Sequence, residues 1–437
     1  MAAVSVRDRL VAQSTTGRYN LFLSLGGVLA VVGLILFVVS LSGETANRAW
    51  QLFHVNWIYF TGLTAGSLAF TAVHKITKAR WSGLVIRFVE ATSGFMVVSF
   101  LGFLVIFLVG YHHIYPEMEG LSRGKAIWLS HDVMFWRLLI GLLIMYTVGF
   151  KLIKADLVAD LFETRGTVTG SRRRLYDRWI GSFDGSPAAR AAQDARIFRL
   201  APTFIVIFAF VATLVAFDGI MALQPHWYSN LLGAFYFMGS FLGAHTLLAQ
   251  TLLVGGSEIG IADLISPKQR HDLGKLVFGF TVFWGYLMFA QFLVIWYGNL
   301  PEETGFVFAR LWGTWLPIGR AVFLGMFVIP FVGLLGVLPK KVPAILSLFA
   351  GVSLVALWLE RYLLVIPSVT GENGPVFGIP ELGPTMMFLG LFLVSYALFA
   401  RTFPMVSPRL AMITLGDEAG HGHAAEPAPL GATAAAH

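Results

Sequence analysis

The sequence contains no cysteine and carries few charged residues for its length. Cysteine is absent from all 437 residues, which excludes disulfides, thiolate zinc sites, Cys-ligated iron–sulfur clusters and covalently attached c-type haem. Only 13% of the residues are charged, whereas a soluble domain has about 25%. We therefore expect no metal or redox centre in this chain, and a surface that mostly faces something other than water.

Long apolar runs occupy most of the sequence. Hydrophobic residues make up 57% of the chain, with 38 Phe and 12 Trp, and a membrane-spanning helix needs about 20 apolar residues. The sequence predicts an all-α polytopic membrane protein with about ten transmembrane helices. The expected spans are 19–42, 50–73, 84–111, 128–153, 200–223, 229–255, 276–298, 306–338, 342–367 and 384–403.

The distribution of Lys and Arg predicts how the chain is oriented. With the N-terminus in the cytoplasm, 23 of the 31 Lys and Arg residues fall on the cytoplasmic side and three, Arg48, Arg123 and Lys125, on the other. Ten spans return the C-terminus to the cytoplasm. The net charge of +7 is thus explained by membrane lipid rather than nucleic acid. The longest cytoplasmic loop, 154–199, is either an anchor on anionic lipid or a docking surface.

Spans two to five faintly resemble spans six to nine. Gly66-Ser67 in span two corresponds to Gly239-Ser240 in span six, and three further pairs of similar segments follow in the same order. The ionisable residues among them are Arg137 with Arg320 and Asp218 with Glu360. Because repeats of four helices keep the same topology, we expect two four-helix bundles side by side, plus two peripheral helices.

This interpretation divides the chain into six parts. They are a cytoplasmic N-terminus (1–18), peripheral helix 1 (19–49), a first bundle with the loop 154–199 (50–223), a second bundle (224–367), an outer loop with peripheral helix 10 (368–403), and a cytoplasmic tail (404–437).

Several motifs resemble those of a known family. They are 217–229 (FDGIMALQPHWYS), 273–278 (LGKLVF), 283–286 (FWGY), 295–304 (IWYGNLPEET) and Glu360-Arg361-Tyr362 before Ile366-Pro367-Ser368. They resemble NrfD/PsrC-like integral membrane subunits, and most of all the ActF-type subunit of bacterial alternative complex III, a respiratory quinol:electron-acceptor oxidoreductase. The resemblance covers nearly the whole chain.

The resemblance implies both partners and a location. It implies a bacterial cytoplasmic (inner) membrane, with menaquinol or ubiquinol as the electron source for the complex. The implied partners are a sister NrfD-like subunit, an iron–sulfur subunit, multihaem and monohaem cytochrome c subunits and small membrane subunits. A terminal oxidase is a further candidate. Haem c and iron–sulfur clusters would be held by these partners, and this chain would hold no cofactor.

Ionisable side chains inside a membrane are costly, so each is a functional candidate. None is firmly assigned as catalytic. The proton-relay or quinol candidates are Asp218, Glu360, Glu90, His245, Arg87, Arg137, Arg320, Arg361 and His226. Asp218 and Glu360 lie near the outer ends of matching helices, where a carboxylate can take and release protons or contact quinol. The alternative for Asp218 is a structural pair with an arginine.

The remaining candidates have structural alternatives too. Arg87 and Glu90 lie on one helix face. They form either a local ion pair or the entrance of a cytoplasmic half-channel for protons. Glu360 and Arg361 point about 100° apart on one helix, so their partners are expected on other helices. His245 is either a proton-relay group near the middle of the membrane or a structural hydrogen-bonding residue. His226, at the outer interface, is an anchor or partner contact, or a base for a quinol headgroup.

Three functions compete at this point. The chain is a scaffold and proton-conducting subunit of a quinol-oxidising complex, or a subunit that itself binds and oxidises quinol beside an iron–sulfur partner. The third hypothesis is a stand-alone secondary transporter, which repeats and buried charges also permit. Purification separates the third from the others, because a transporter is isolated alone.

Overall fold

The computed structural model describes residues 5–117, 120–371 and 373–422, and these residues are helical with no strand. This confirms the all-α fold. The end of the predicted tail, 423–437, lies outside the described residues. Within them, nine helical segments are long and apolar enough to cross a membrane. They are Asn20–Ser40 (α2), Ile86–Ile114 (α4 to α6), His131–Thr167 (α8 and a 3₁₀ turn), Pro187–Leu223 (α10 and a 3₁₀ turn), Leu232–Glu258 (α11), Pro267–Gly298 (α12), Gly313–Gly333 (α14 and α15), Pro343–Thr370 (α17) and Ile379–Thr402 (α18).

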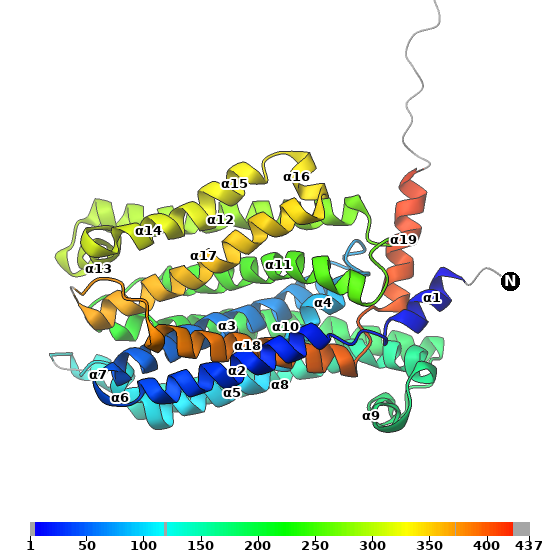
Figure 1. The fold of residues 1–437 in the computed structure, drawn as a ribbon, viewed down its shortest axis with the longest axis horizontal. Helices are drawn as coiled ribbons and strands as arrows, with labels where there is room; N and C mark the ends of the chain where they lie inside the picture. Colours follow the sequence, from blue (N-terminus) through cyan, green and yellow to red (C-terminus); the bar gives the residue numbers. More distant parts are fainter. Residues whose placement is uncertain (1–4, 118–119, 372, 423–437) are drawn as a thin grey trace, which may run out of the picture.

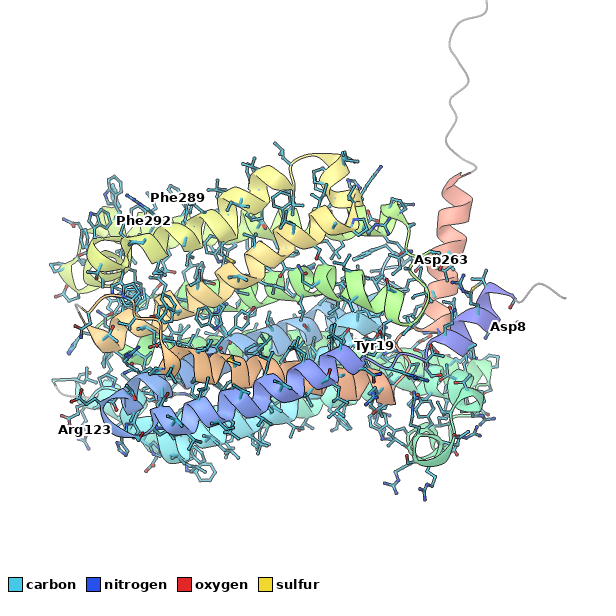
Figure 2. All side chains as sticks on the ribbon, in the orientation of Figure 1. Asp8, Tyr19, Arg123, Asp263, Phe289 and Phe292 are labelled. Carbon is cyan, nitrogen blue, oxygen red and sulfur yellow. The ribbon has the colours of Figure 1, made fainter. Side chains whose placement is uncertain are left out.

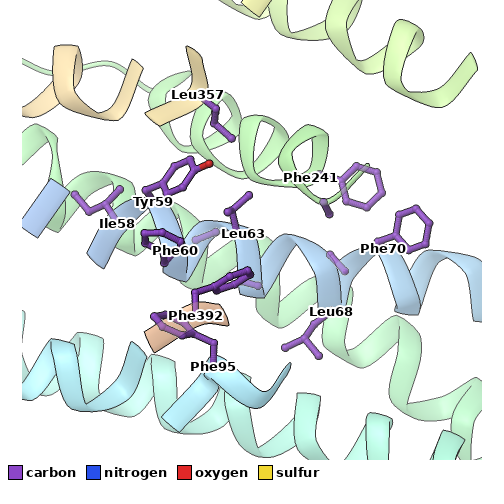
Figure 3. Close-up of a cluster of buried hydrophobic side chains, with 14 of the residues drawn as sticks. Ile58, Tyr59, Phe60, Leu63, Leu68, Phe70, Phe95, Phe241, Leu357 and Phe392 are labelled. Carbon is purple, nitrogen blue, oxygen red and sulfur yellow. The ribbon is translucent and has the colours of Figure 1, made fainter. Parts of the chain in front are cut away.

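Helix α3 (Ala46–Ile76) is the tenth long helix and lies in the middle of the fold. Its 31 residues extend about 46 Å, enough to span a bilayer. It is less apolar than the other nine because it faces protein, with almost every residue from Ala49 to Ala72 buried. In Figure 3, Phe95, Phe241, Leu357 and Phe392 surround its side chains from other helices.

Shorter helices lie at the two ends of the long ones (Figure 1). The end with α1 (Val6–Gln13), α9 (Gly170–Ile180) and α19 (Pro408–Gly422) is called the α19 end, and the opposite end the α13 end. The latter carries α6 (Tyr111–Ile114), α7 (Arg123–Trp128) and α13 (Pro301–Leu311). Both limits of the described chain thus lie at the end that the Lys and Arg count assigns to the cytoplasm.

The long helices form two groups that meet at α3 and α11. The first group contains α3, α4 to α6, α8 (His131–Thr164) and α10 (Pro187–Gly219). The second contains α11, α12, α14 (Leu316–Phe323) with α15 (Ile329–Gly333), and α17. The matching Gly-Ser pairs of the repeat lie where the two helix groups meet, since a Cβ on Gly66 would be 2.2 Å from the Ser240 carbonyl oxygen.

Two predicted boundaries are wrong. The loop expected at 154–199 is mostly helical, because α8 continues to Thr164 and α10 begins at Pro187, where Ser186 caps it through the Ala189 N–H. The eighth span does not start at 306. Residues 301–311 form the separate helix α13. Gly313, with φ of +59°, interrupts the helical conformation before α14. A short helix, α16 (Val337–Lys341), then leads to α17.

The two peripheral helices, α2 and α18, pack against each other along their length. A Cβ on Gly33 of α2 would lie 2.2 Å from the Met387 backbone nitrogen, and one on Gly390 of α18 would lie 2.3 Å from the Ala30 nitrogen. Small residues that let backbones approach are typical of helix contacts in membranes. The outer face of α2 is apolar and exposed, as expected for lipid contact.

We predict that Gly33→Leu detaches α2 from α18, because its side chain would overlap backbone that cannot move aside. The expected loss is about 3 kcal/mol of unfolding free energy, the upper range for overpacked sites, measured by unfolding of the detergent-solubilised protein. Gly27→Leu is the matched control on the same helix, because nothing lies within 4 Å of its Cβ position. Equal stability of the two variants would contradict this contact.

Helix α1 is held to the loop between α11 and α12 by one ion pair. Arg9 places two guanidinium nitrogens 2.7 Å from the two carboxylate oxygens of Asp263 and donates to the Gly260 carbonyl. Figure 2 shows Asp8 of α1 and Asp263 at the α19 end, opposite Arg123. These hydrogen bonds hold the pKa of the Asp263 carboxyl below its ordinary value.

This lowered pKa predicts a pH-dependent attachment of α1. The stabilisation is present above the unfolded pKa of Asp, about 3.9, and is lost as the pH falls through the folded value. The protection factors of residues 6–13 against amide exchange, which correct for the intrinsic pH dependence of exchange, are expected to fall as the pH is lowered from 6 through the folded pKa. Asp263→Asn should have lower protection factors than the wild type at pH 6, and the difference should disappear at low pH. Equal protection factors of the wild type and Asp263→Asn at pH 6 would refute the prediction.

Candidate functional site

Five charged side chains, four of them buried, lie together near the α19 end, and we call them the five-charge cluster. They are Lys75 of α3, Arg87 and Glu90 of α4 (Ile86–Glu90), and Asp156 and Asp160 of α8. The Arg87 side chain has no exposed surface. Because charges in such surroundings must be paired, the geometry of the cluster is decided by its ion pairs.

Arg87 is the centre of the five-charge cluster. Its guanidinium contacts Glu90, one turn along α4, and lies 2.9 Å from Asp156 and 2.5 Å from Asp160. Lys75 bonds the other Asp156 oxygen at 2.6 Å, and Ser407 donates to Asp160 at 2.8 Å. The predicted Arg87–Glu90 ion pair is confirmed, but it is one part of a larger network.

A cavity of about 840 Å³ leads to this cluster from the α19 end. Its wall includes Lys75 and Asp156, and also Lys78, Asp194 and Arg409. Arg409 of α19 bonds Asp194 of α10 at 2.9 and 3.1 Å, so α19 forms one side of the opening. Water in this cavity would reach Asp156, whereas the Glu90 atom Oε1 is buried without a hydrogen-bond partner among the described residues.

Asp218 is paired with Arg137 near the α13 end. The pair is bidentate, with Nε to Oδ2 at 3.0 Å and Nη2 to Oδ1 at 2.5 Å. The Arg137 guanidinium also lies 3.9 Å from the centre of the Trp128 ring. The structural pair expected as the alternative for Asp218 is therefore present. Asp218 and Trp227 both line a cavity of about 70 Å³.

Glu360 and Arg361 contact each other, contrary to the expectation that each would pair only with other helices. The Arg361 Nη1 lies 3.1 Å from Glu360 Oε1. Its other nitrogen does reach α11, donating to the Tyr236 carbonyl at 3.2 Å. Gly239 leaves the necessary space, since a Cβ there would be 2.9 Å from this nitrogen.

A second large cavity, of about 560 Å³, lies between α12, α13, α14 and α17, and we call it the α13 cavity. Glu360 and Arg320 both line it. So does Arg310 of α13, which is 4% exposed and donates to the Phe306 and Leu364 carbonyls and to Ser368. No ion pair of Arg310 or Arg320 occurs among the residues that the structure describes.

The two histidine candidates lie apart from these groups. His245 bonds the Phe241 carbonyl of its own helix at 2.8 Å and is surrounded by the rings of Phe70, Phe241 and Phe280. Within the described chain, no hydrogen bond joins it to a candidate carboxylate. His226 is exposed in the turn before α11, while the following residue, Trp227, is buried and stacks on Phe306.

The sequence interpretation missed Lys75, Asp156, Asp160 and Arg310. The two aspartates were assigned to the cytoplasmic loop because the fourth span was ended at 153. Their spacing of four residues, which places both on one helix face, was the signal for a continued α8. Arg310 was placed inside the eighth span. In the described residues, no group of three or more His, Cys, Asp or Glu could hold a metal ion.

Fold and site together define a polytopic α-helical membrane protein with charged groups buried at both ends of its helices. No family model matches the chain. The chain is similar to a selenate reductase subunit of Mesobacillus selenatarsenatis, with 23% identity over 379 residues that cover 81% of this chain and 83% of that protein. The similarity therefore extends through both groups of helices.

We predict that Arg87→Gln strongly destabilises the protein, because three buried carboxylates would then face only Lys75. Removing one partner of a buried ion network typically costs about 3–5 kcal/mol. Thermal or denaturant unfolding in detergent measures the loss. The control is Arg173→Gln in an exposed pair with Asp177, with an expected change below about 1 kcal/mol. Similar losses of stability in both variants would show that the buried cluster stabilises the protein no more than an exposed ion pair does.

Proposed function

We propose that this chain is an NrfD-like membrane subunit of a multi-subunit redox complex, of the ActF type in a respiratory quinol-oxidising complex. Its contribution is a scaffold and a proton-conducting route, while partner subunits hold the haem and iron–sulfur centres. The similarity to a protein named as a reductase subunit supports membership of such a complex. The motifs of the fifth, seventh and ninth spans support the finer assignment.

The observation that carries the proton route is the five-charge cluster at the base of an 840 Å³ cavity. Three carboxylates face two cations there, so a neutral cluster requires one bound proton. Buried excess charge is costly, and an added proton removes it. Water in the cavity can deliver that proton to Asp156, and Glu90 is the most deeply placed acceptor.

Hydroxyl groups along α3 continue the route toward the α13 end. Thr71, Ser67, Thr64 and Thr61 follow one another at intervals of three or four residues and share one face. The hydroxyls of Thr64 and Ser67 are buried and unpaired in the described structure. Buried polar groups of this kind are usually bridged by water.

The hydroxyl series ends in a hydrogen-bonded chain across three helices. Thr61 contacts Ser99 at 2.5 Å, and Ser99 contacts Tyr146 at 2.6 Å. From Lys75 to Thr61 the helix rises about 21 Å, so this face of α3 covers the depth that was first assigned to His245. The aromatic surroundings of His245 favour its structural role.

In this proposal, the proton leaves the protein at the Asp218–Arg137 pair. His54 of α3 contacts the Gly219 carbonyl at 2.7 Å, which brings the outer part of α3 next to Asp218. The pair holds Asp218 beside the 70 Å³ cavity. A proton arriving there would weaken the ion pair and could then pass to water at the α13 end.

The test uses the assembled complex in proteoliposomes, with quinol as reductant. Glu90→Gln is expected to lower the rate of proton uptake at the α19 end, counted beyond the protons that quinol oxidation itself releases, by about 100-fold, the smaller end of the effect of one positioned proton-transfer group, while quinol oxidation continues. Asp218→Asn should act in the same direction. The control is Asp177→Asn, which alters only an exposed ion pair.

Three results would contradict the proposal or a part of it. Unchanged proton transfer in both Glu90→Gln and Asp218→Asn would remove the route. A chain that purifies alone and transports a solute would instead establish the transporter hypothesis. Loss of all quinol turnover in Asp218→Asn, with an intact complex, would place this residue in a quinol site rather than in the proton route.

A further inference from the structure

Ser407 joins the chain segment in front of α19 to the five-charge cluster. It is 2% exposed, and its hydroxyl donates to Asp160 Oδ1 at 2.8 Å. The same hydroxyl oxygen accepts the Leu410 N–H in the first turn of α19 at 3.4 Å. In Figure 1, α19 runs across the ends of the long helices rather than along them. One contact of a cluster carboxylate thus comes from outside the membrane-spanning helices.

Both carboxylate oxygens of Asp160 have hydrogen-bond partners. Arg87 Nη2 donates to Oδ2 at 2.5 Å, and Ser407 donates to Oδ1. A hydroxyl has a single hydrogen to donate, and Asp160 is its acceptor here. Protonation of Asp160 at Oδ1 would leave the Ser407 hydrogen without an acceptor among the described residues. This arrangement therefore favours an ionised Asp160.

The other two carboxylates of the cluster each have an oxygen without a hydrogen bond. In the described structure these buried atoms are Glu90 Oε1 and Asp156 Oδ2, although the latter lies 2.9 Å from an Arg87 nitrogen. The two carboxyl groups are close enough to interact directly. Two ionised carboxylates can only accept, whereas a protonated one can donate to the other. Because Asp156 also faces the Lys75 ammonium at 2.6 Å, a proton on Glu90 that is donated to Asp156 would give both atoms a partner.

Helix α19 is fixed in place by contacts outside the cluster, and these also hold Ser407. Arg409 forms the bidentate pair with Asp194 of α10. Farther along α19, the buried hydroxyl of Thr414 accepts the Gly83 N–H at 3.2 Å. A Cβ on Gly83 would lie 2.2 Å from an α19 carbonyl oxygen, so the two segments are in close contact. Ser407 therefore keeps its position only while α19 stays attached.

We infer that α19 controls where the five-charge cluster holds its bound proton, with Ser407 as the positioning residue, an inference that rests on the proposed function for the passage of that proton. Ser407 keeps Asp160 ionised, so the proton stays on Glu90, which donates it in a hydrogen bond to Asp156. Asp156 lines the 840 Å³ cavity, so this proton is one step from water. Asp160 and Ser407 line a cavity of about 10 Å³, which has room for at most one water molecule.

The test is infrared spectroscopy of the assembled complex, with the aspartate carboxyl groups labelled with carbon-13. A protonated glutamic acid then absorbs at its ordinary frequency, whereas the band of a protonated aspartic acid is shifted. The wild type is expected to show an unshifted band that Glu90→Gln removes. In Ser407→Ala, Asp160 loses a hydrogen bond to its charged form. The ratio of shifted to unshifted band should then rise by about tenfold.

Two control variants accompany this measurement. Ser407→Thr keeps the hydroxyl group and should retain the wild-type spectrum. Ser42→Ala removes an exposed serine hydroxyl that bonds within its own chain segment, and it should change nothing. A wild-type band ratio in Ser407→Ala would overturn the inference. So would equal ratios in Ser407→Ala and Ser407→Thr, because packing rather than the hydroxyl would then decide the position of the proton.

Thr414→Val tests the role of α19 itself. The substitution keeps the size of the side chain, removes hydrogen bonds that hold α19 to residues 80–83, and touches no member of the cluster. Residues 408–416 should exchange their amide hydrogens faster, and the band ratio should change in the same direction as in Ser407→Ala. Unchanged exchange or a wild-type band ratio would overturn the control by α19.

These outcomes separate the inference from the proposed function, because the spectra require no quinol turnover. In proteoliposomes, Ser407→Ala should also lower proton uptake at the α19 end about tenfold, in proportion to the displaced proton. If the complex moves protons while Ser407→Ala keeps the wild-type band ratio, only the role of Ser407 fails. If the ratio changes but Glu90→Gln and Asp218→Asn move protons like the wild type, the role of Ser407 stands and the proposed function fails.

Discussion

The central constraint on this structure is the burial of a polar helix inside a membrane protein. Helix α3 carries amide, imidazole and hydroxyl groups along most of its length, and these have no water to bond in a bilayer interior. Neighbouring helices supply the partners: Trp358 donates to Asn56 at 2.9 Å, and Asn56 donates to Thr385 at 3.0 Å. Tyr236 donates to the Ile58 carbonyl at 2.9 Å. The positions of α11, α17 and α18 around α3 follow from these bonds and from the apolar contacts in Figure 3.

The same constraint explains where chemistry is possible. Where α3 and its neighbours satisfy every polar group, the contacts only hold helices together. Where groups remain unpaired in the described structure, as for Thr64, Ser67 and Glu90 Oε1, water or protons have a place to bind. The five-charge cluster and the α13 cavity are the largest such departures from full pairing among the described residues. They lie in different helix groups and at different ends of the long helices.

Much of the architecture could be predicted from the sequence, because a span is a local property. Apolar runs and the Lys and Arg distribution depend on nearby residues only, and the all-α fold with its long helices followed from them. The Arg87–Glu90 pair was predictable for the same reason, since residues three apart on a helix are neighbours. Span ends were less predictable where charged residues are buried, as at Asp156 and Asp160 of α8. A charged residue near the end of an apolar run predicts a loop outside the membrane, and only the tertiary structure shows the ion pair that lets it be buried.

The sequence by itself determined that the chain is a cysteine-free membrane protein of long helices with a short inventory of ionisable groups. Only the tertiary structure decided which of these groups meet. It joined Lys75, Arg87 and Asp160 from three helices, paired Asp218 with Arg137, and placed Arg320 beside a cavity with no ion pair among the described residues. Helical periodicity specifies the face on which a side chain lies. The partner across that face depends on how distant helices pack, which no local pattern encodes.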